Sequence, residues 1–407
     1  KKKKNPKNPG GGALNTPPPK KTPPRGGGRA GPPPAAFSLP TPAQALRAPA
    51  YTDRMKHILF CGGGSAGHTV PNLAVMQELE GKCRLSYAGS SGGIEERLAK
   101  EAGYLFYGVP CPKLVRSLTP KNLTLPFRMV QSERRALALL NELKPDLVFS
   151  KGGYASLPYL FAARRLHIPA LTHESDLSPG LATRLTARRC KLVLTSFEET
   201  ARRFANGRCV GSPMRKELFA GSPSRARAKY GFRKGKPVLL VLGGGSGSRT
   251  LNEAVSAHLP ALLDAFQILH LYGKGSPLQS APSSAPRGYT ALPFEPDMAS
   301  AYAAADFVLS RAGSNTVFEA LALQKPALLV PLERASRGDQ LENARYFEAR
   351  GLCHILRERE LTRPEALPSA LSALQEDEAL RAHLQNTPVQ NGTPAILRAI
   401  EETLGAF

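Results

Sequence analysis

The chain has 407 residues, 42% of them hydrophobic, which at about 150 residues per domain is enough for two or three domains with buried cores. Its six cysteines lie far apart without a C-x-x-C pair, which excludes a zinc ribbon and argues against a disulfide scaffold. No segment approaches the roughly 18 consecutive apolar residues of a membrane-spanning helix. We also expect no secretory signal, because the basic N-terminal run has no apolar segment behind it.

The net charge of +23 is unevenly distributed. Residues 1–54 contain 11 Lys or Arg, one acidic residue, 13 Pro and 7 Gly. Such a composition cannot bury enough apolar surface to offset chain entropy, so it predicts a disordered basic tail. Such a tail could be a basic arm that binds nucleic acid or lipid head groups, or it could be an inert extension. We favour the inert extension, because its runs lack the interleaved aromatic residues that stack on bases. The fold is expected to begin at Met55.

Beyond Met55, short apolar strands alternate with helical stretches. A strand at 57–60 runs into a glycine-rich loop and a helix near 71–80. The same half is expected to contain strands at 84–89, 146–150, 169–174 and 191–196, and helices at 94–102 and 133–143. Continuous β-branched and Leu-rich strands between helices are typical of a parallel sheet.

The pattern restarts about 180 residues later, with a strand at 237–242 that runs into a second glycine-rich loop. A helix near 250–263 follows, with further strands expected at 267–272, 289–293, 306–309 and 326–331. The repeat predicts an α/β fold with two Rossmann-like doubly wound domains, at 55–215 and 216–407, joined near 211–236. Ligands of open α/β sheets bind beyond the carboxyl ends of the strands, so two such domains are expected to face a cleft.

The first glycine-rich loop, Gly62 to Gly67, matches the dinucleotide pattern G-x-G-x-x-G. That function requires an acid at the end of the second strand, but this strand ends Tyr87-Ala88-Gly89-Ser90. NAD binding is therefore not expected. The loop still lets a backbone approach a negatively charged ligand at a helix N-terminus. His68 closes the loop and is a candidate for acid–base chemistry, the alternative being a structural histidine.

Two further glycine-rich loops lie in the second half. The loop at 243–249 lacks the Lys-Ser/Thr ending of a P-loop. The loop at 310–319 follows a strand and opens a helix, so its N–H groups suit a diphosphate. Glu319, one turn into this helix, could accept hydrogen bonds from two ribose hydroxyls, or could simply stabilise the helix dipole. The sequence has no D-x-D, which argues against a metal-held diphosphate.

Eight segments, in this order, carry a resemblance: GGGSAGHTVPNLAV (62–75), SKGGYASLP (150–158), HESDLSPGLATR (173–184), VGSPMR (210–215), GGGSGSRTLN (243–252), FEPDMASAYAAAD (294–306), RAGSNTVFEAL (311–321) and GDQLENA (338–344). Together they resemble the MurG family, the undecaprenyl-diphosphomuramoylpentapeptide β-N-acetylglucosaminyltransferases of GT-B fold.

The resemblance implies transfer of GlcNAc from UDP-GlcNAc to the C4 hydroxyl of a lipid-linked muramoyl pentapeptide in peptidoglycan synthesis. Configuration would invert, and neither metal nor cofactor would be needed. The partners would be the two substrates and an anionic membrane surface, with no nucleic acid, and the location the cytoplasmic face of the bacterial cell membrane. Alternatives are another GT-B enzyme, such as a lipid glycosyltransferase or a UDP-GlcNAc epimerase, and a basic nucleic-acid-binding protein.

The resemblance also assigns residues to the cleft. In the first half, Ser65, Ala66 and Gly67 would lie beside the sugar and the acceptor diphosphate. Asp176 replaces a family Asn near the sugar, and Arg215 would contact the nucleotide.

In the second half, Gly245 stands where the family usually has Ser, so a hydroxyl contact would be lost or passed to Ser246. Glu295 aligns with a usually apolar residue whose backbone meets the uracil. Gln340 and Asn343 would contact the GlcNAc hydroxyls. The uridine diphosphate would be held, with the ribose on the last residue, by Ser314, Asn315, Thr316, Val317, Phe318 and Glu319.

A base must take the proton from the attacking hydroxyl. We expect His68 to be this base, with Glu174 and Asp176 as alternatives.

Basic residues surround apolar ones within 113–135: Lys113, Arg116, Lys121, Arg128, Arg134 and Arg135 around Leu123, Leu125, Phe127 and Val130. Such a rim suits a monotopic membrane surface. The alternative is an ordinary amphipathic helix whose apolar side lies in the core.

Overall fold

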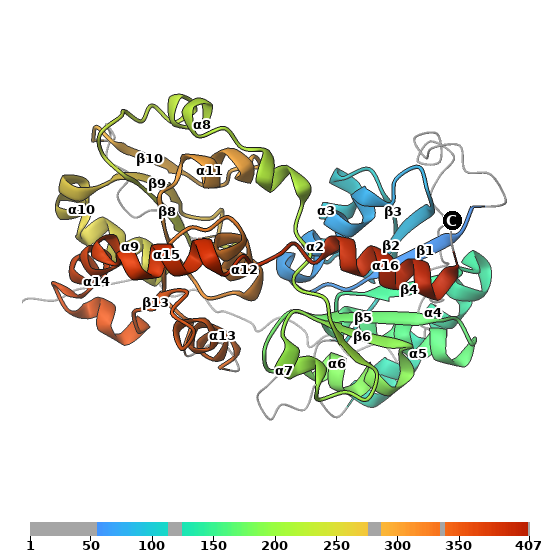
Figure 1. Ribbon diagram of the computed structural model, residues 1–407. Helices are drawn as coiled ribbons and strands as arrows, with labels where there is room; N and C mark the ends of the chain where they lie inside the picture. Colours follow the sequence, from blue (N-terminus) through green and yellow to red (C-terminus); the bar gives the residue numbers. More distant parts are fainter. Residues whose placement is uncertain (1–54, 113–123, 276–285, 334–337, 406–407) are drawn as a thin grey trace, which may run out of the picture.

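The computed structural model describes residues 55–112, 124–275, 286–333 and 338–405 (Figure 1). The expected tail, 1–54, and the first part of the expected membrane segment, 113–123, lie outside these ranges.

Within the described residues, the first half forms a seven-stranded parallel sheet in the order β3-β2-β1-β4-β5-β6-β7. Its strands are β1 (His57–Cys61), β2 (Arg84–Ser90), β3 (Leu105–Val109), β4 (Leu147–Ser150), β5 (Ala170–Glu174), β6 (Leu192–Thr195) and β7 (Gly207–Cys209). Its helices are α2 (Ala66–Glu78), α3 (Ile94–Glu101), α4 (Leu125–Leu143), α5 (Leu157–Arg165), α6 (Leu181–Thr186) and α7 (Glu198–Ala201).

The second half forms a six-stranded parallel sheet among the described residues, in the order β10-β9-β8-β11-β12-β13. Its strands are β8 (Val238–Leu242), β9 (Gln267–Leu271), β10 (Tyr289–Leu292), β11 (Phe307–Ser310), β12 (Ala327–Leu329) and β13 (His354–Ile355). The helices are α8 (Pro223–Lys229), α9 (Arg249–Ala257), α10 (Leu259–Ala265), α11 (Met298–Ala304), α12 (Ser314–Ala322), α13 (Asp339–Glu348), α14 (Ala366–Glu376), α15 (Glu378–Asn386) and α16 (Thr393–Leu404).

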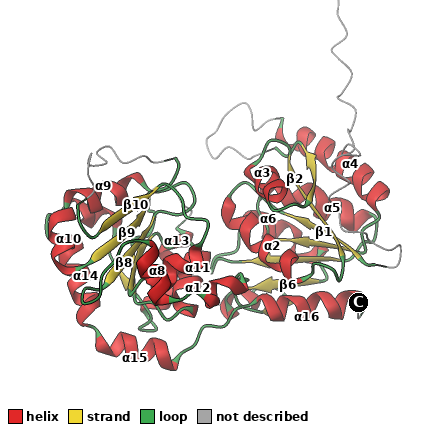
Figure 2. Ribbon diagram, turned by 90° about the horizontal axis from the view of Figure 1, so that it is seen from above, coloured by secondary structure: helices red, strands yellow, loops and turns green. Residues whose placement is uncertain are grey.

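The prediction of two doubly wound α/β domains is confirmed (Figure 2). One helix differs from expectation: the stretch 250–263 is divided into α9 and α10, which meet at His258. Pro260 stands in the first turn of α10. It cannot donate a backbone hydrogen bond in a helix interior but is tolerated in a first turn, so a new helix starts there.

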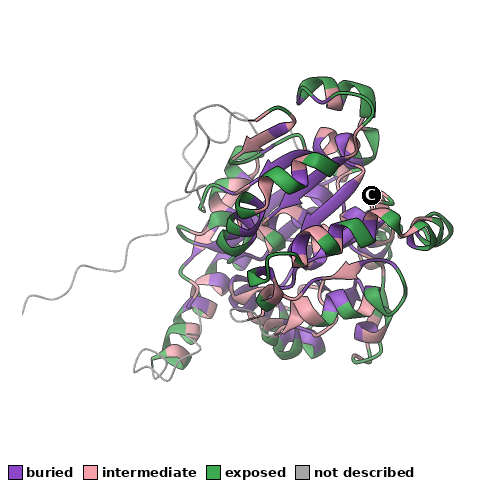
Figure 3. Ribbon diagram, turned by 90° about the vertical axis from the view of Figure 1, so that its left-hand side faces the viewer, coloured by how far each residue is buried: buried purple, intermediate pink, exposed green. Residues whose placement is uncertain are grey.

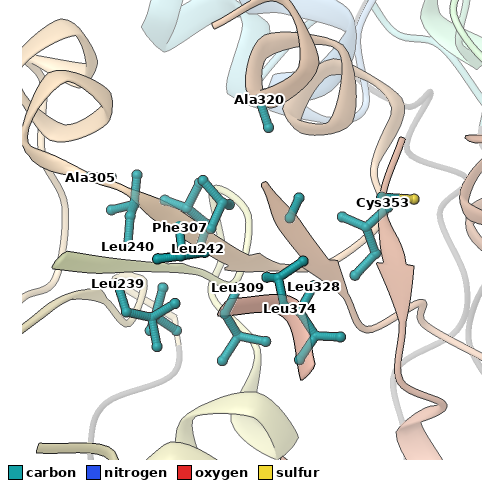
Figure 4. Close-up of a cluster of buried hydrophobic side chains, with 14 of the residues drawn as sticks. Leu239, Leu240, Leu242, Ala305, Phe307, Leu309, Ala320, Leu328, Cys353 and Leu374 are labelled. Carbon is teal, nitrogen blue, oxygen red and sulfur yellow. The ribbon is translucent and has the colours of Figure 1, made fainter. Parts of the chain in front are cut away.

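The central strands are the most buried elements of both sheets (Figure 3). All five residues of β1 and all five of β8 are buried, as expected for a parallel sheet covered on both faces. Figure 4 shows the second core, where Leu240, Leu309 and Leu328 come from neighbouring strands and Ala320 points toward the sheet from α12.

The last helix departs from the expected division at 216–407, because α16 packs against the first sheet instead of the second (Figure 1). Ile396, Ala399 and Ile400 are fully buried in one cluster with Ile58 and Phe60 of β1. The apolar stripe of an amphipathic helix does not specify which core it covers, so the sequence pattern could not place this helix.

Ile400→Ala should therefore destabilise the protein although it lies near the end of the chain. Loss of a buried Ile side chain typically costs about 2–5 kcal/mol. The exposed neighbour Arg398 serves as the control, and Arg398→Ala should change the free energy of unfolding by about 0.5 kcal/mol at most. Denaturant unfolding of both variants measures the difference; equal stabilities would contradict the packing of α16 on the first sheet.

Candidate functional site

A cavity of about 280 Å³ lies between the two sheets, at the carboxyl ends of their strands. It is lined by the start of α2 from the first half, by the linker, and by the glycine-rich loops of the second half. Eight of the residues expected at the site are in this lining: Ala66, Gly67, Arg215, Gly245, Glu295, Asn315, Thr316 and Glu319.

The first glycine-rich loop is shaped around a buried carboxylate that sequence reasoning missed. Glu95 accepts hydrogen bonds from the backbone N–H groups of Gly64 and Ser90, both at 3.0 Å. A Cβ atom on Gly63 would come within 2.2 Å of this carboxylate. The loop therefore needs glycine because it folds over Glu95. Four residues separate Glu95 from Ser90, the last residue of β2, and no sequence motif marks its position.

His68 lies in the first turn of α2, and its ring is directed toward the loop after β4. Its Nδ1 lies 3.0 Å from the carbonyl oxygen of Lys151. A carbonyl can only accept, so Nδ1 carries the proton, and in the neutral ring Nε2 is the nitrogen that can take one. His68 itself does not belong to the cavity lining, although Gly67 and Val70 do.

The helix α12 presents its N-terminus to the cavity through Asn315 and Thr316. Unpaired N–H groups and the helix dipole favour an anion at this end. The Asn315 side chain also donates to the carbonyl of Gly67 at 2.9 Å, which joins α12 to α2 across the cleft. Val317 and Phe318 point elsewhere: both side chains are buried in the second core, so only their backbone could meet a ligand.

Glu319 lines the cavity and accepts a hydrogen bond from the Tyr302 hydroxyl at 3.0 Å. Burial raises the pKa of Glu319, while the Tyr302 hydrogen bond and the nearby Arg215 lower it. The carboxylate is thus held by a neutral hydroxyl and faced by one cation. Tyr302 itself was not singled out from the sequence, because a Tyr within an Ala-rich helix carries no motif signal.

A short loop of the first half, 174–177, contacts the second half directly. Asn343 donates from Nδ2 to Asp176 Oδ1 at 3.0 Å and accepts from the Leu177 N–H at 2.9 Å. Ser314 donates to the carbonyl of Ser175. Burial and the neighbouring Glu174 raise the pKa of Asp176 to about 6.

Glu174 is a weaker candidate for a base than its neighbour. Its carboxylate is buried and accepts hydrogen bonds from Gly180 N at 2.9 Å, Thr183 Oγ1 at 2.6 Å and Asp176 N at 3.2 Å. These donors hold the carboxylate in the fold and occupy the lone pairs that a base would use.

Of the remaining predicted residues, Glu295 and Gly245 line the cavity, whereas Gln340 and Ser65 do not. The carboxylate of Glu295 accepts a hydrogen bond from the Tyr230 hydroxyl at 2.8 Å. Its side chain therefore serves the fold, and only its backbone is available to the uracil ring. Gly245 faces Ala66, whose Cβ would lie 3.5 Å from an added Cβ. Gln340 accepts from Leu332 N at 3.0 Å, and Ser65, the exposed N-cap residue of α2, does not line the cavity.

The first half of α4 is exposed, whereas its second half packs in the core. Phe127 is 75% exposed and Val130 47%, with Arg128 and Arg134 exposed beside them. The buried residues of the helix come later: Ser132, Ala136, Leu139 and Leu140.

Among the described residues, no helix has the length and apolar character that crossing a membrane requires.

Residues 58–195 match the glycosyltransferase family 28 N-terminal domain, and residues 238–396 match the glycosyltransferase family 28 C-terminal domain. The crystal structure of Acinetobacter baumannii MurG superposes with a TM-score of 0.67 at 26% identity, covering 85% of this chain and 99% of that one. The glycosyltransferase of kitacinnamycin, 17% identical with a TM-score of 0.64 over 86% of this chain and 100% of that one, shares the fold.

Curated relatives match over most of their length. An enzyme of Lachnoclostridium phytofermentans is 39% identical over 86% of this chain and 99% of its own. One from Shouchella clausii is 44% identical over 76% of this chain and 88% of its own. Both are named UDP-N-acetylglucosamine–N-acetylmuramyl-(pentapeptide) pyrophosphoryl-undecaprenol N-acetylglucosamine transferase. On this identity and coverage, and with the cleft described above, the chain belongs to this family of glycosyltransferases.

Proposed function

We propose that this protein transfers GlcNAc from UDP-GlcNAc to the C4 hydroxyl of undecaprenyl-diphospho-muramoylpentapeptide, with inversion and without a metal ion. The observation that carries the proposal is a cavity between the two sheets whose lining includes six residues that the family motifs assign to the donor: Arg215, Gly245, Glu295, Asn315, Thr316 and Glu319. The reaction forms a bond from the acceptor oxygen to C1 of the sugar. It breaks the bond from C1 to the diphosphate, and UDP leaves.

The second half binds the donor in this proposal. Glu319 accepts hydrogen bonds from the ribose hydroxyls, and Tyr302 holds its carboxylate in place. The diphosphate lies at the N-terminus of α12, near Arg215. Gln340 and Asn343 meet the GlcNAc hydroxyls.

The departing UDP gains negative charge as the bond to C1 breaks. The N–H groups at the start of α12 and the Arg215 guanidinium stabilise this charge, because both favour an anion and are already in place before the reaction. Loss of one such donor typically reduces turnover about 10²–10³-fold.

His68 takes the acceptor proton in this proposal. The Lys151 carbonyl fixes the tautomer in which Nε2 is the acceptor. Asp176 is the alternative, since a carboxyl with a pKa of about 6 is a competent base near neutral pH.

The protein acts at the cytoplasmic face of the bacterial membrane in this proposal, because its acceptor is a lipid. The exposed start of α4, with Phe127 and Val130 next to Arg128, supports contact with an anionic lipid surface.

The His68→Ala variant should lose about 10²–10⁴-fold in kcat, the usual contribution of a general base. UDP affinity should stay within a few-fold, because the ring does not line the cavity. Steady-state kinetics and calorimetry with UDP measure the two effects.

The matched variant is Asp176→Asn. If the carboxylate were the base, wild-type kcat would fall as pH drops through about 6, and Asp176→Asn would remove both turnover and this pH dependence. Near-normal turnover of His68→Ala alongside that result would replace His68 by Asp176 in the mechanism.

Glu319→Gln should weaken UDP and UDP-GlcNAc alike, about ten- to a hundredfold, because hydrogen bonds to a charged partner contribute about 1.5–3 kcal/mol. The difference from wild type should largely vanish for 2′,3′-dideoxy-UDP, which has no ribose hydroxyls to bind. Titration calorimetry of both proteins with these nucleotides makes the comparison.

The control is Glu342→Gln, an exposed carboxylate in the first turn of α13. It should leave all three affinities unchanged. If Glu319 only stabilised its helix dipole, Glu319→Gln would lower the unliganded melting temperature and weaken all three nucleotides equally.

The double variant Phe127→Ser/Arg128→Glu should bind less to anionic vesicles than wild type does, because it loses an exposed ring and reverses a charge. Its activity should fall more with a long-chain acceptor than with a short-chain soluble analogue. The control, Phe219→Ser/Arg225→Glu, makes the same changes at exposed positions on another surface. Equal losses on both acceptors would show that α4 serves the fold and not the membrane.

A further inference from the structure

The side chain of Lys151 is a buried cation with no part in the chemistry described above, where only its backbone carbonyl has a role. It follows β4 at the carboxyl edge of the first sheet and is only 2% exposed. Burial lowers its pKa to about 8, while Glu174 and Asp176 raise it. A buried ammonium is costly unless polar partners and opposite charges surround it, so its position requires an explanation.

The partners of Lys151 connect two parts of the candidate site. Its ammonium donates to the Ser175 hydroxyl, in the loop 174–177. Its own backbone carbonyl accepts from His68 Nδ1 at 3.0 Å, and its N–H donates to the Cys61 carbonyl at 3.0 Å. One residue therefore contacts both the proposed base and the loop.

The loop in turn holds the two helices of the second half that carry donor-binding residues. The Ser175 carbonyl accepts from Ser314, the first residue of α12. Asp176 and Leu177 both hydrogen-bond to the side chain of Asn343, on α13. A displacement of this loop would thus be felt at both helix N-termini.

We propose that Lys151 is a positioning residue for glycosyl transfer: its ammonium holds the loop 174–177 where Ser314 and Asn343 meet it, in register with His68. Lys151 touches no substrate itself. This role is an addition to the proposed function, and its kinetic test rests on that function.

The charges of the loop explain why a cation is needed here. Glu174 and Asp176 are neighbouring carboxylates, and the charge of Glu174 raises the pKa of Asp176. The Lys151 ammonium offsets this repulsion and supplies a hydrogen bond to the residue between them. Without it, the loop can relieve the repulsion only by moving or by taking up a proton.

Lys151→Met keeps most of the side-chain length and removes the charge. We expect UDP-GlcNAc to bind about 2–10-fold more weakly in calorimetry, the effect of losing one hydrogen bond from a displaced Asn343 to the sugar. Affinity for UDP alone should fall less, because UDP lacks the GlcNAc that Asn343 meets in the proposed function. The kcat of transfer should also fall.

The matched control is Lys325→Met. Lys325 is another partly buried lysine; it donates to the Ala305 carbonyl at 2.7 Å, away from the cavity. This variant should lose stability without any change in nucleotide affinity or turnover. A Lys151→Met variant that also loses only stability would overturn the proposal.

A double-mutant cycle with Asn343→Ala provides the second test. If Lys151 acts through the loop, the losses in kcat/KM for UDP-GlcNAc should be clearly less than additive in Lys151→Met/Asn343→Ala. Fully additive losses would overturn the connection.

Ser175→Ala keeps the charge but removes the hydroxyl partner, and it should weaken UDP-GlcNAc more than UDP even if Lys151→Met does not fold. Equal effects on the two ligands would overturn the proposal. A wild-type protein that binds UDP-GlcNAc but transfers no sugar would contradict the proposed function, whereas the binding comparison would still decide the role of Lys151.

Discussion

The arrangement of the cleft depends on apolar packing in which each half of the molecule supplies an element to the core of the other. Phe197, just after β6, is 2% exposed and lies in the second core, with its ring centroid 5.1 Å from that of Phe318 and 4.9 Å from that of Tyr346. In return, α16 buries Ile396 and Ile400 against the first sheet. Because both contacts are buried, the two carboxyl edges are held face to face before any ligand binds.

Among the described residues, the polar contacts across the cleft include hydrogen bonds from the beginnings of α12 and α13. Asn315 reaches Gly67, and Asn343 reaches the loop 174–177. Hydrogen bonds of this kind contribute only about 0.5–1.5 kcal/mol each, so they orient the cleft more than they stabilise it. A ligand at the site can compete for these hydrogen bonds while the apolar packing keeps the two halves in place.

The carboxylates in and around the site form two groups that differ in how many hydrogen-bond donors surround them. Glu95 and Glu174 are surrounded by backbone N–H and hydroxyl donors, and they hold loops in shape. Glu319 and Asp176 have fewer donors, and burial raises the pKa of both. The second pair therefore remains available to ribose hydroxyls or to a proton. This difference arises from which backbone groups lie nearby, and residue type alone does not reveal it.

The sequence by itself determined the two parallel-sheet halves, the glycine-rich loops and the candidate binding residues of the third loop, 310–319. Strand and helix periodicity and loop composition are local properties of the chain. Glu319 could be selected in this way, since it stands at a fixed spacing after a strand and a glycine. Only the tertiary structure placed α16 on the first sheet, Glu95 under the first loop and Lys151 behind the loop 174–177. Asp176 and Asn343 lie 167 residues apart, and their contact forms only when two separately patterned domains meet. Contacts of that kind are fixed by packing between domains, and no local pattern in the sequence encodes them.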